Sequence, residues 1–184
     1  MISPVPSLLN ALLDASQVGG ANVGAELNPG LEQNELLDLL APLKLQVPQS
    51  FMEMYRWRNG CKDDHCGFYF RDLTFVSLQE AIECREIILT YYALDADDPF
   101  DYAHFLPFSR LQGKDFFGVL CTPIGDLPPA ADNVISVSEG GNVLNFHSIE
   151  SMLRTCIDWV DQDAISNEEL ELEIWRQHNP GIFE

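Results

Sequence analysis

Two cysteines and a histidine lie close together in the sequence. Cys61, His65 and Cys66 carry thiol and imidazole groups, the ligand types that zinc prefers. A structural zinc site needs four ligands at tetrahedral positions and usually takes two of them from a second close pair. The remaining candidates for a fourth ligand have no distinctive spacing: Cys121, His104 and His147. We therefore expect no metal here, and we interpret the segment as a turn between a helix and a strand.

Other motifs for catalysis or ligand binding are missing from the sequence. The acidic run from Asp95 to Asp101 has oxygen atoms suited to calcium, but it lacks the glycine and the terminal glutamate of an EF-hand loop. There is no Gly-x-Ser-x-Gly nucleophile elbow, no glycine-rich phosphate loop and no His-Glu-x-x-His pair. The four histidines form no recognisable pair with a carboxylate. We therefore expect no catalytic residue and no cofactor.

A short basic and aromatic segment interrupts this acidic chain. Trp57 lies between Arg56 and Arg58, and Asn59-Gly60 follows. Trp and Arg are favoured at the energetic centres of protein interfaces. The segment therefore predicts a partner-binding site at Trp57, Arg58, Asn59 and Gly60. The alternative is structural: the aromatic side chains face the core and the arginines neutralise nearby acids.

The charge balance restricts the kinds of partner. The chain of 184 residues has 10 Lys and Arg against 29 Asp and Glu, a formal net charge of −19. Such a surface repels a phosphate backbone and an anionic bilayer, so we expect neither nucleic acid nor membrane as a partner. Many of the acids lie between residues 158 and 173, among them Asp161, Glu168 and Glu171. This segment is either a solvated face that maintains solubility or a docking face for a basic protein.

Features of the sequence also indicate a cellular location. Residues 1–16 lack the basic start of a secretory signal, and polar residues interrupt their apolar run. No apolar run reaches the roughly 20 residues of a transmembrane helix. The five cysteines are odd in number and scattered, as is typical of reduced thiols. We therefore expect a cytoplasmic protein.

Three helices are predicted in the first sixty residues. The first follows Ser7 and is expected to be peripheral, because residues 18–25 contain three glycines and indicate a flexible tether. The second begins at Pro29. The third follows Pro48 and ends at Gly60, where a left-handed cap is favourable.

The remaining sequence alternates between helix and strand patterns. Ser77 starts a helix through a Ser-x-x-Glu capping box, Ser148 caps a second helix expected to cover one sheet face, and a capping box at Ser166 opens a final acidic helix. Four short apolar runs have the composition of strands, the last two forming a hairpin: 105–108, 116–121, 134–137 and 143–146. These patterns predict an α+β fold with helices packed on a mainly antiparallel sheet.

This order of elements suggests three regions. Residues 1–30 form an N-terminal helix and tether, and residues 31–165 form the α+β domain. Residues 166–184 form a C-terminal acidic helix that packs on this domain or extends it.

Several short motifs occur in an order known from one family. The aromatic helix ends in Trp57-Arg58-Asn59-Gly60, the middle contains Leu106-Pro107-Phe108 and the segment from Gly113 to Gly118, and a hairpin at Gly141-Asn142-Val143 precedes the helix that Ser148 opens. From about Leu31 to Val160 the chain thereby resembles the SUKH superfamily, which includes the Smi/Knr cell-wall regulators of fungi and many bacterial toxin-immunity proteins. It departs from the family at Cys61, where a second glycine is common, and at Lys114, which separates Gly113 from Asp115.

The resemblance implies a function. Members of this family are Smi/Knr-like α+β adaptors without enzymatic activity that bind another protein in a groove beside the sheet, and it places a binding role on Asp115. We therefore expect an immunity-type protein that neutralises a partner toxin, such as a basic toxin domain, by stoichiometric binding. The alternative is a regulatory or scaffold domain that binds a housekeeping partner, for example in cell-wall synthesis. A hydrolase or metalloprotein is a weaker alternative.

Overall fold

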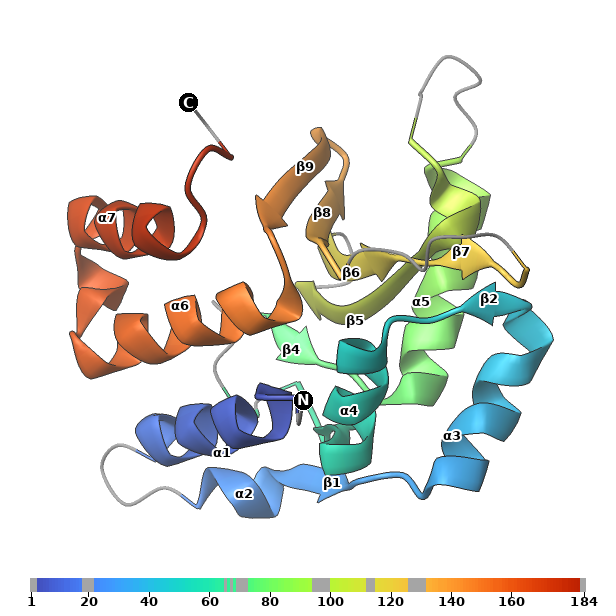
Figure 1. Ribbon diagram of the computed structural model, residues 1–184, viewed down its shortest axis with the longest axis horizontal. Coiled ribbons are helices and arrows are strands. Elements are labelled where there is room, and N and C mark those ends of the chain that lie inside the picture. The colour runs from blue at the N-terminus through green and yellow to red at the C-terminus, as the bar shows by residue number, and fades with distance from the viewer. Residues whose placement is uncertain are drawn as a thin grey trace.

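A five-stranded antiparallel sheet forms the centre of the protein (Figure 1). The computed structural model describes residues 3–17, 22–64, 66, 68, 73–93, 100–111, 115–125 and 132–182. In spatial order the strands are β4 (Thr74–Phe75), β5 (Phe105–Leu111), β6 (Asp115–Leu120), β8 (Val134–Ser138) and β9 (Gly141–Phe146). Every neighbouring pair is antiparallel, so the predicted α+β fold with a mainly antiparallel sheet is confirmed.

Successive side chains along these strands face opposite sides of the sheet. Phe105 belongs to one apolar cluster and Leu106 to another, and Phe116 and Val119 divide in the same way. This alternation is the ordinary consequence of the two-residue period of a strand. Each face of the sheet therefore carries its own apolar cluster, and helices cover both faces.

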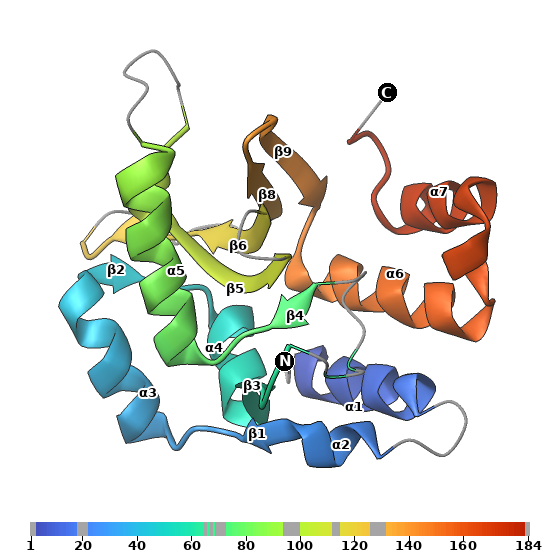
Figure 2. The ribbon, with the colours of Figure 1, turned by 180° about the vertical axis from the view of Figure 1, so that it is seen from behind.

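Helix α5 (Leu78–Tyr91) covers one face of the sheet (Figure 2). Cys84 and Ile88 of this helix lie in the same apolar cluster as Phe105 and Phe116. The helix begins where predicted, because the Ser77 side chain accepts a hydrogen bond of 3.2 Å from the N–H of Glu80.

The larger core lies on the other face, under α4 (Gln49–Trp57) and the start of α6 (Ile149–Asp161). Phe51 of α4 meets Phe108 of the sheet, with ring centroids 6.5 Å apart. Ser148 and Ser151 form a reciprocal capping box that starts α6. Helix α6 starts beside the end of β9, whose Phe146 ring lies 6.4 Å from the ring of Trp159 between centroids, and it runs beyond the sheet between two other helices (Figure 1), so its predicted cover of the sheet is partial.

These two helices are α1 (Val5–Ser16) and α7 (Glu168–His178), which lie on opposite sides of α6 (Figure 1). The expectation that the first helix is peripheral is wrong. Its residues Val5, Leu9 and Leu12 follow the i, i+4, i+7 spacing of one helix face, and all three are buried in the larger core. The helix also begins before Ser7, at Val5.

Short elements complete the first half of the chain. A turn of helix, α2 (Val23–Glu26), leads into β1 (Leu27–Pro29), which pairs with β3 (Arg58–Cys61). Helix α3 (Gln33–Leu40) and β2 (Leu45–Gln46) follow, and β2 pairs with β7 (Thr122–Pro123). Within the described residues, short 3₁₀ turns span Ala41–Leu43, Tyr102–His104 and Ala164–Ser166.

Three predicted helix boundaries are wrong. Pro29 lies in β1 rather than at a helix start, because its strand is paired with β3. Gly60 has the expected positive φ of 74°, but it lies inside β3, and the helix before it ends at Trp57. The last helix takes Asn167, rather than Ser166, as its N-cap.

No helix among the residues that the structure describes has the length and hydrophobicity needed to cross a bilayer. Residues 18–21 of the predicted tether, and residues 95–99 of the acidic run, lie outside the described residues.

Candidate partner-binding groove

A groove of about 550 Å³ lies where α1, α4 and the segment between β1 and α3 meet. It contains three of the residues of the basic and aromatic segment, together with two carboxylates. Its lining residues are Pro6, Gly30, Leu31, Glu32, Glu53, Arg56, Trp57 and Arg58. The groove therefore combines an indole ring with two cationic and two anionic side chains.

The backbone on two sides of the groove is in direct contact. The N–H of Leu31 donates a 2.9 Å hydrogen bond to the carbonyl of Tyr55. A Cβ atom at position 30 would lie 2.0 Å from the carbonyl oxygen of Arg56, so only glycine permits this approach. Gly30 thereby fixes the segment before α3 against the last turn of α4.

Trp57 has both a structural and a surface role. Its indole Nε1 donates a 2.8 Å hydrogen bond to Oδ1 of Asn10 in α1, and its ring lies 5.4 Å from the ring of Phe68 between centroids. The side chain is half-buried and also lines the groove. The ring thus makes a structural contact and also lines the groove, and a partner-binding role for it stays a prediction.

Polar atoms without partners lie in the side chains of two groove residues. The guanidinium of Arg58 sits 5.9 Å from the centroid of the Trp57 ring, and its Nε is buried without a hydrogen bond within the described residues. Oε2 of Glu53 is likewise buried and unpaired there, whereas Oε1 accepts a 3.1 Å hydrogen bond from Gln49. Buried polar groups are nearly always satisfied in folded proteins. An unmatched donor and an unmatched acceptor therefore occur in the same groove wall.

Asn59 and Gly60 follow Arg58 in the chain but do not line the groove. Oδ1 of Asn59 accepts a 2.8 Å hydrogen bond from the N–H of Leu78, the first residue of α5. A Cβ atom on Gly60 would lie 2.3 Å from the backbone carbon of Val76. Asn59 and Gly60 therefore hold β3 against the start of α5, which is a structural role.

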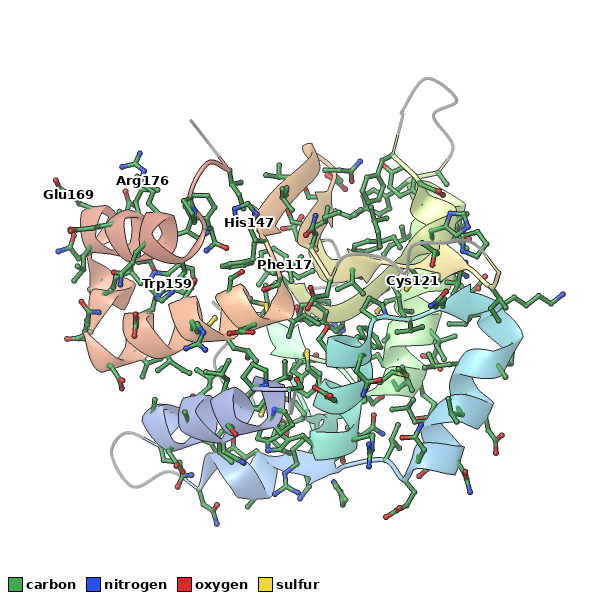
Figure 3. All side chains as sticks on the ribbon, in the orientation of Figure 1. Phe117, Cys121, His147, Trp159, Glu169 and Arg176 are labelled. Carbon is green, nitrogen blue, oxygen red and sulfur yellow. The ribbon has the colours of Figure 1, made fainter. Side chains whose placement is uncertain are left out.

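The acidic residues predicted to bind a partner lie on other elements. Asp115 begins β6, where it pairs with Leu111. Asp161 ends α6 and Glu168 begins α7, and both are exposed, while Glu171 is half-buried. Figure 3 shows Glu169 and Arg176 on the same helix α7, on the side of α6 away from α1. None of the four predicted acids lines the groove.

The structure offers little support for a metal site. Within the described residues, no three His, Cys, Asp or Glu side chains gather in a way that suits a metal ion. His147 contacts the carbonyl of Pro180 at 2.8 Å, and His104 contacts Asp101. His65 lies outside the described residues, so the expectation of no metal remains a prediction.

Six groove residues were not among the predicted binding residues: Pro6, Gly30, Leu31, Glu32, Glu53 and Arg56. Glu53 lies four residues before Trp57, a spacing that places both on one face of α4, but no sequence pattern connects that helix with Pro6 or with residues 30–32. The Asn-Pro-Gly tripeptide that ends at Gly30 indicates a turn, but it does not indicate that the turn would meet the end of α4.

No protein-family model matches the chain, and no curated protein matches it either. The resemblance to the SUKH superfamily therefore stays a prediction.

Proposed function

We propose that this protein is a non-enzymatic, protein-binding domain that holds its partner in the groove beside Trp57. The observation that carries this proposal is the placement of Arg56, Trp57 and Arg58 together in one groove. Trp and Arg are the side chains that most often dominate binding energy, and they do so in recessed, desolvated places.

The polar groups of the groove suit a polypeptide partner. A peptide group offers one donor and one acceptor, and the groove is lined by carboxylate side chains that accept hydrogen bonds and by guanidinium side chains that donate them. The indole ring of Trp57 provides apolar area next to them.

The charge of the whole chain favours a basic partner. At −19, the protein attracts a cationic protein over distances set by the salt concentration, while the groove itself, with two arginines and two glutamates, is locally balanced. The long-range attraction of the partner and its anchoring in the groove therefore depend on different residues.

Following the resemblance to the SUKH superfamily, the proposed partner is a basic toxin domain that this chain neutralises by stoichiometric binding in the cytoplasm. The resemblance alone supports this finer part of the proposal. A regulatory partner would use the same groove and the same chemistry.

A comparative capture experiment tests the proposal. The full chain, an Arg56→Gln variant and an Arg176→Gln control are used as baits in lysate of the native cell. Arg56 is exposed in the groove and Arg176 is exposed on α7, so both changes remove one positive charge from an exposed side chain. We expect one protein to be retained in equimolar amount by the wild type and the control, and to be depleted at least tenfold on the Arg56 variant, which corresponds to about 1.4 kcal/mol.

Two results contradict the proposal. Equal retention by all three baits places the partner elsewhere on the surface, and the absence of any equimolar partner argues against a protein-binding function. If a partner is found, its expression alone and together with this chain distinguishes the two roles. Growth inhibition that co-expression relieves supports immunity, and a partner without toxicity supports regulation.

A further inference from the structure

The side chains of Cys61 and Cys66 hydrogen-bond to each other. Cys61 ends strand β3 and is 8% exposed, whereas Cys66 is half-buried against the larger core. One thiol of the pair is therefore inside the protein, and the other is partly accessible to solvent.

Lys62 and Asp64, which follow Cys61 in the chain, are anchored to their surroundings. The backbone N–H of Lys62 donates a 2.8 Å hydrogen bond to the carbonyl of Glu26, and its Nζ donates one of 2.6 Å to the carbonyl of Ala25. Asp64 forms a 3.0 Å ion pair with Arg110 of β5. These contacts restrain the chain directly after Cys61, while Cys66 packs against the same core to which Cys61 belongs.

The contacts of each sulfur favour different protonation states. Two hydrogen bonds lower the pKa of Cys66, the larger effect coming from the Cys61 thiol and the other from the backbone N–H of Phe68. Burial and the carboxylates of Glu26 and Asp63 act in the opposite direction, but the pKa of Cys66 is lowered overall. The hydrogen bond with Cys66, followed by burial, raises the pKa of Cys61. Of the two thiols, Cys66 is therefore the one that loses its proton more readily.

The other three cysteines have a different environment. Cys84, Cys121 and Cys156 are all buried. Burial raises the pKa of Cys84 to about 11 and that of Cys121 to about 12. Buried, protonated thiols react slowly, because the thiolate is the nucleophile.

We propose that Cys66 is a site of reversible oxidation by hydroperoxides, and that Cys61 resolves the oxidised sulfur as an intrachain disulfide. The Cys66 thiolate attacks one oxygen of hydrogen peroxide, the O–O bond breaks, and hydroxide leaves, giving a sulfenic acid. The sulfur of Cys61 then attacks the sulfur of Cys66, the S–O bond breaks, and water leaves with the proton of Cys61. The two thiols together lose two electrons, and the peroxide gains them. This site is separate from the groove and does not depend on the proposed function.

The test uses the purified, reduced full chain and hydrogen peroxide in equimolar amount. We expect peptide mass analysis to find a Cys61–Cys66 disulfide, two hydrogens lighter than the dithiol, that dithiothreitol reverses. The Cys61→Ala variant is expected to stop at the sulfenic acid of Cys66, which dimedone traps. The Cys66→Ser variant is expected to lose the rapid oxidation, and the control Cys84→Ala to keep it. Disulfides that involve other cysteines, or oxidation that Cys66→Ser leaves unchanged, would overturn the proposal.

A second measurement needs no variant and therefore does not depend on their folding. Iodoacetamide alkylation of the native chain near pH 7 is expected to label Cys66 at least tenfold faster than Cys84 or Cys121, as the lower pKa and greater exposure require. Equal labelling of all thiols contradicts the proposal. So does an elemental analysis that finds one zinc per chain with Cys61 and Cys66 protected until the metal is chelated, because the thiols would then be metal ligands.

Discussion

The indole Nε1 of Trp57 lies 2.8 Å from Oδ1 of Asn10, a residue 47 positions earlier in the chain. This hydrogen bond joins the end of α4 to the middle of α1. Because Pro6 of α1 also lines the groove, the N-terminal helix contributes both a wall of the groove and a support for its central aromatic ring. The helix that the sequence suggested to be peripheral is part of the candidate site.

Removing residues 1–25 is therefore expected to unfold the protein or abolish its cooperative melting. The deletion takes away Val5, Leu9, Leu12 and Val23, all buried in the larger core. Thermal and urea unfolding of the truncated chain test this expectation.

Within the full chain, Leu12→Ala should lower the free energy of unfolding by about 2–5 kcal/mol. Leu37→Ala is the matched control, because Leu37 is 46% exposed on α3 and its loss should cost well under about 1 kcal/mol. Equal effects of the two changes would show that α1 contributes little to the core.

The contact between Asn10 and Trp57 is measurable by a double-mutant cycle. Asn10→Ala removes the acceptor, and Trp57→Phe removes the donor while keeping an aromatic ring beside Phe68. We expect a coupling energy of about 1 kcal/mol from urea unfolding of the four proteins, the usual contribution of one hydrogen bond. Asn10→Ala combined with Trp175→Phe is the control, since Trp175 donates instead to the carbonyl of Asn145. The effects of those two changes on the free energy of unfolding should be additive.

Gly60 is expected to tolerate no side chain. Its φ of 74° is unfavourable for other residues, and a Cβ atom would also lie 2.3–2.5 Å from the backbone of Val76 and Ser77. Gly141 has a φ of 116° as well, but nothing lies within 4 Å of its would-be Cβ atom. Gly141→Ala therefore measures the cost of the backbone conformation alone, about 1–3 kcal/mol. Gly60→Ala should lower the free energy of unfolding by clearly more than Gly141→Ala, and equal losses would mean that the clash is relieved elsewhere.

The parts of the fold that the sequence predicted well depend on local signals. The strands around Phe116 and Ile135 followed from apolar runs between turn residues, and the helix starts at Ser77 and Ser148 followed from side chains that satisfy their own backbone. Each of these signals spans a few residues. Tertiary packing did not override them.

The errors and omissions arise where distant segments meet. Pro29 suggested a helix start, but Leu27 pairs with Cys61, and Nδ2 of Asn28 donates hydrogen bonds to the carbonyls of Asn59 and Cys61. No local pattern encodes that pairing. The groove has the same origin, because Pro6, Gly30 and Glu53 come together only through the packing of α1 and the close contact at Gly30. Trp57 and its neighbouring arginines were identified from residue type alone.

Stability should fall at alkaline pH because of the buried thiols. An unfolded thiol ionises near pH 9.0, whereas burial raises the pKa of Cys84 to about 11 in the folded protein. The folded state then binds the proton more tightly, so its stability is complete below pH 9 and declines as the pH rises toward 11. One such thiol contributes a slope of about 1.4 kcal/mol per pH unit. Urea unfolding between pH 9 and 11 should show a smaller slope for Cys84→Ala than for the wild type.

Cys66 provides the control for this experiment. Its pKa in the folded protein is lowered rather than raised, chiefly by the hydrogen bond from Cys61, so it adds no loss of stability above pH 9. In a Cys61→Ala background, Cys66→Ala should leave the slope unchanged; this background is needed because the Cys66 thiol raises the pKa of Cys61. A slope unchanged by Cys84→Ala would show that other groups, such as the buried Tyr55, whose pKa burial also raises, account for the alkaline loss.

Binding kinetics should separate the acidic surface from the groove. The predicted rim acids Asp161, Glu168 and Glu171 lie at the end of α6 and on α7, outside the groove, and surface charges of this kind act mainly on the rate of encounter. Replacing all three by their amides should slow association with the captured partner and flatten its salt dependence, with little effect on dissociation. Arg56→Gln should instead speed dissociation by about tenfold, because Arg56 lies in the groove, where direct contacts form.

Arg56 also tests the groove more cleanly than Trp57, whose loss would disturb its contacts with Asn10 and Phe68. Rates measured at two salt concentrations decide between the assignments: if the rim variant changed dissociation and the Arg56 variant changed only association, the binding surface would lie on α7, and the groove would be a feature of the fold alone.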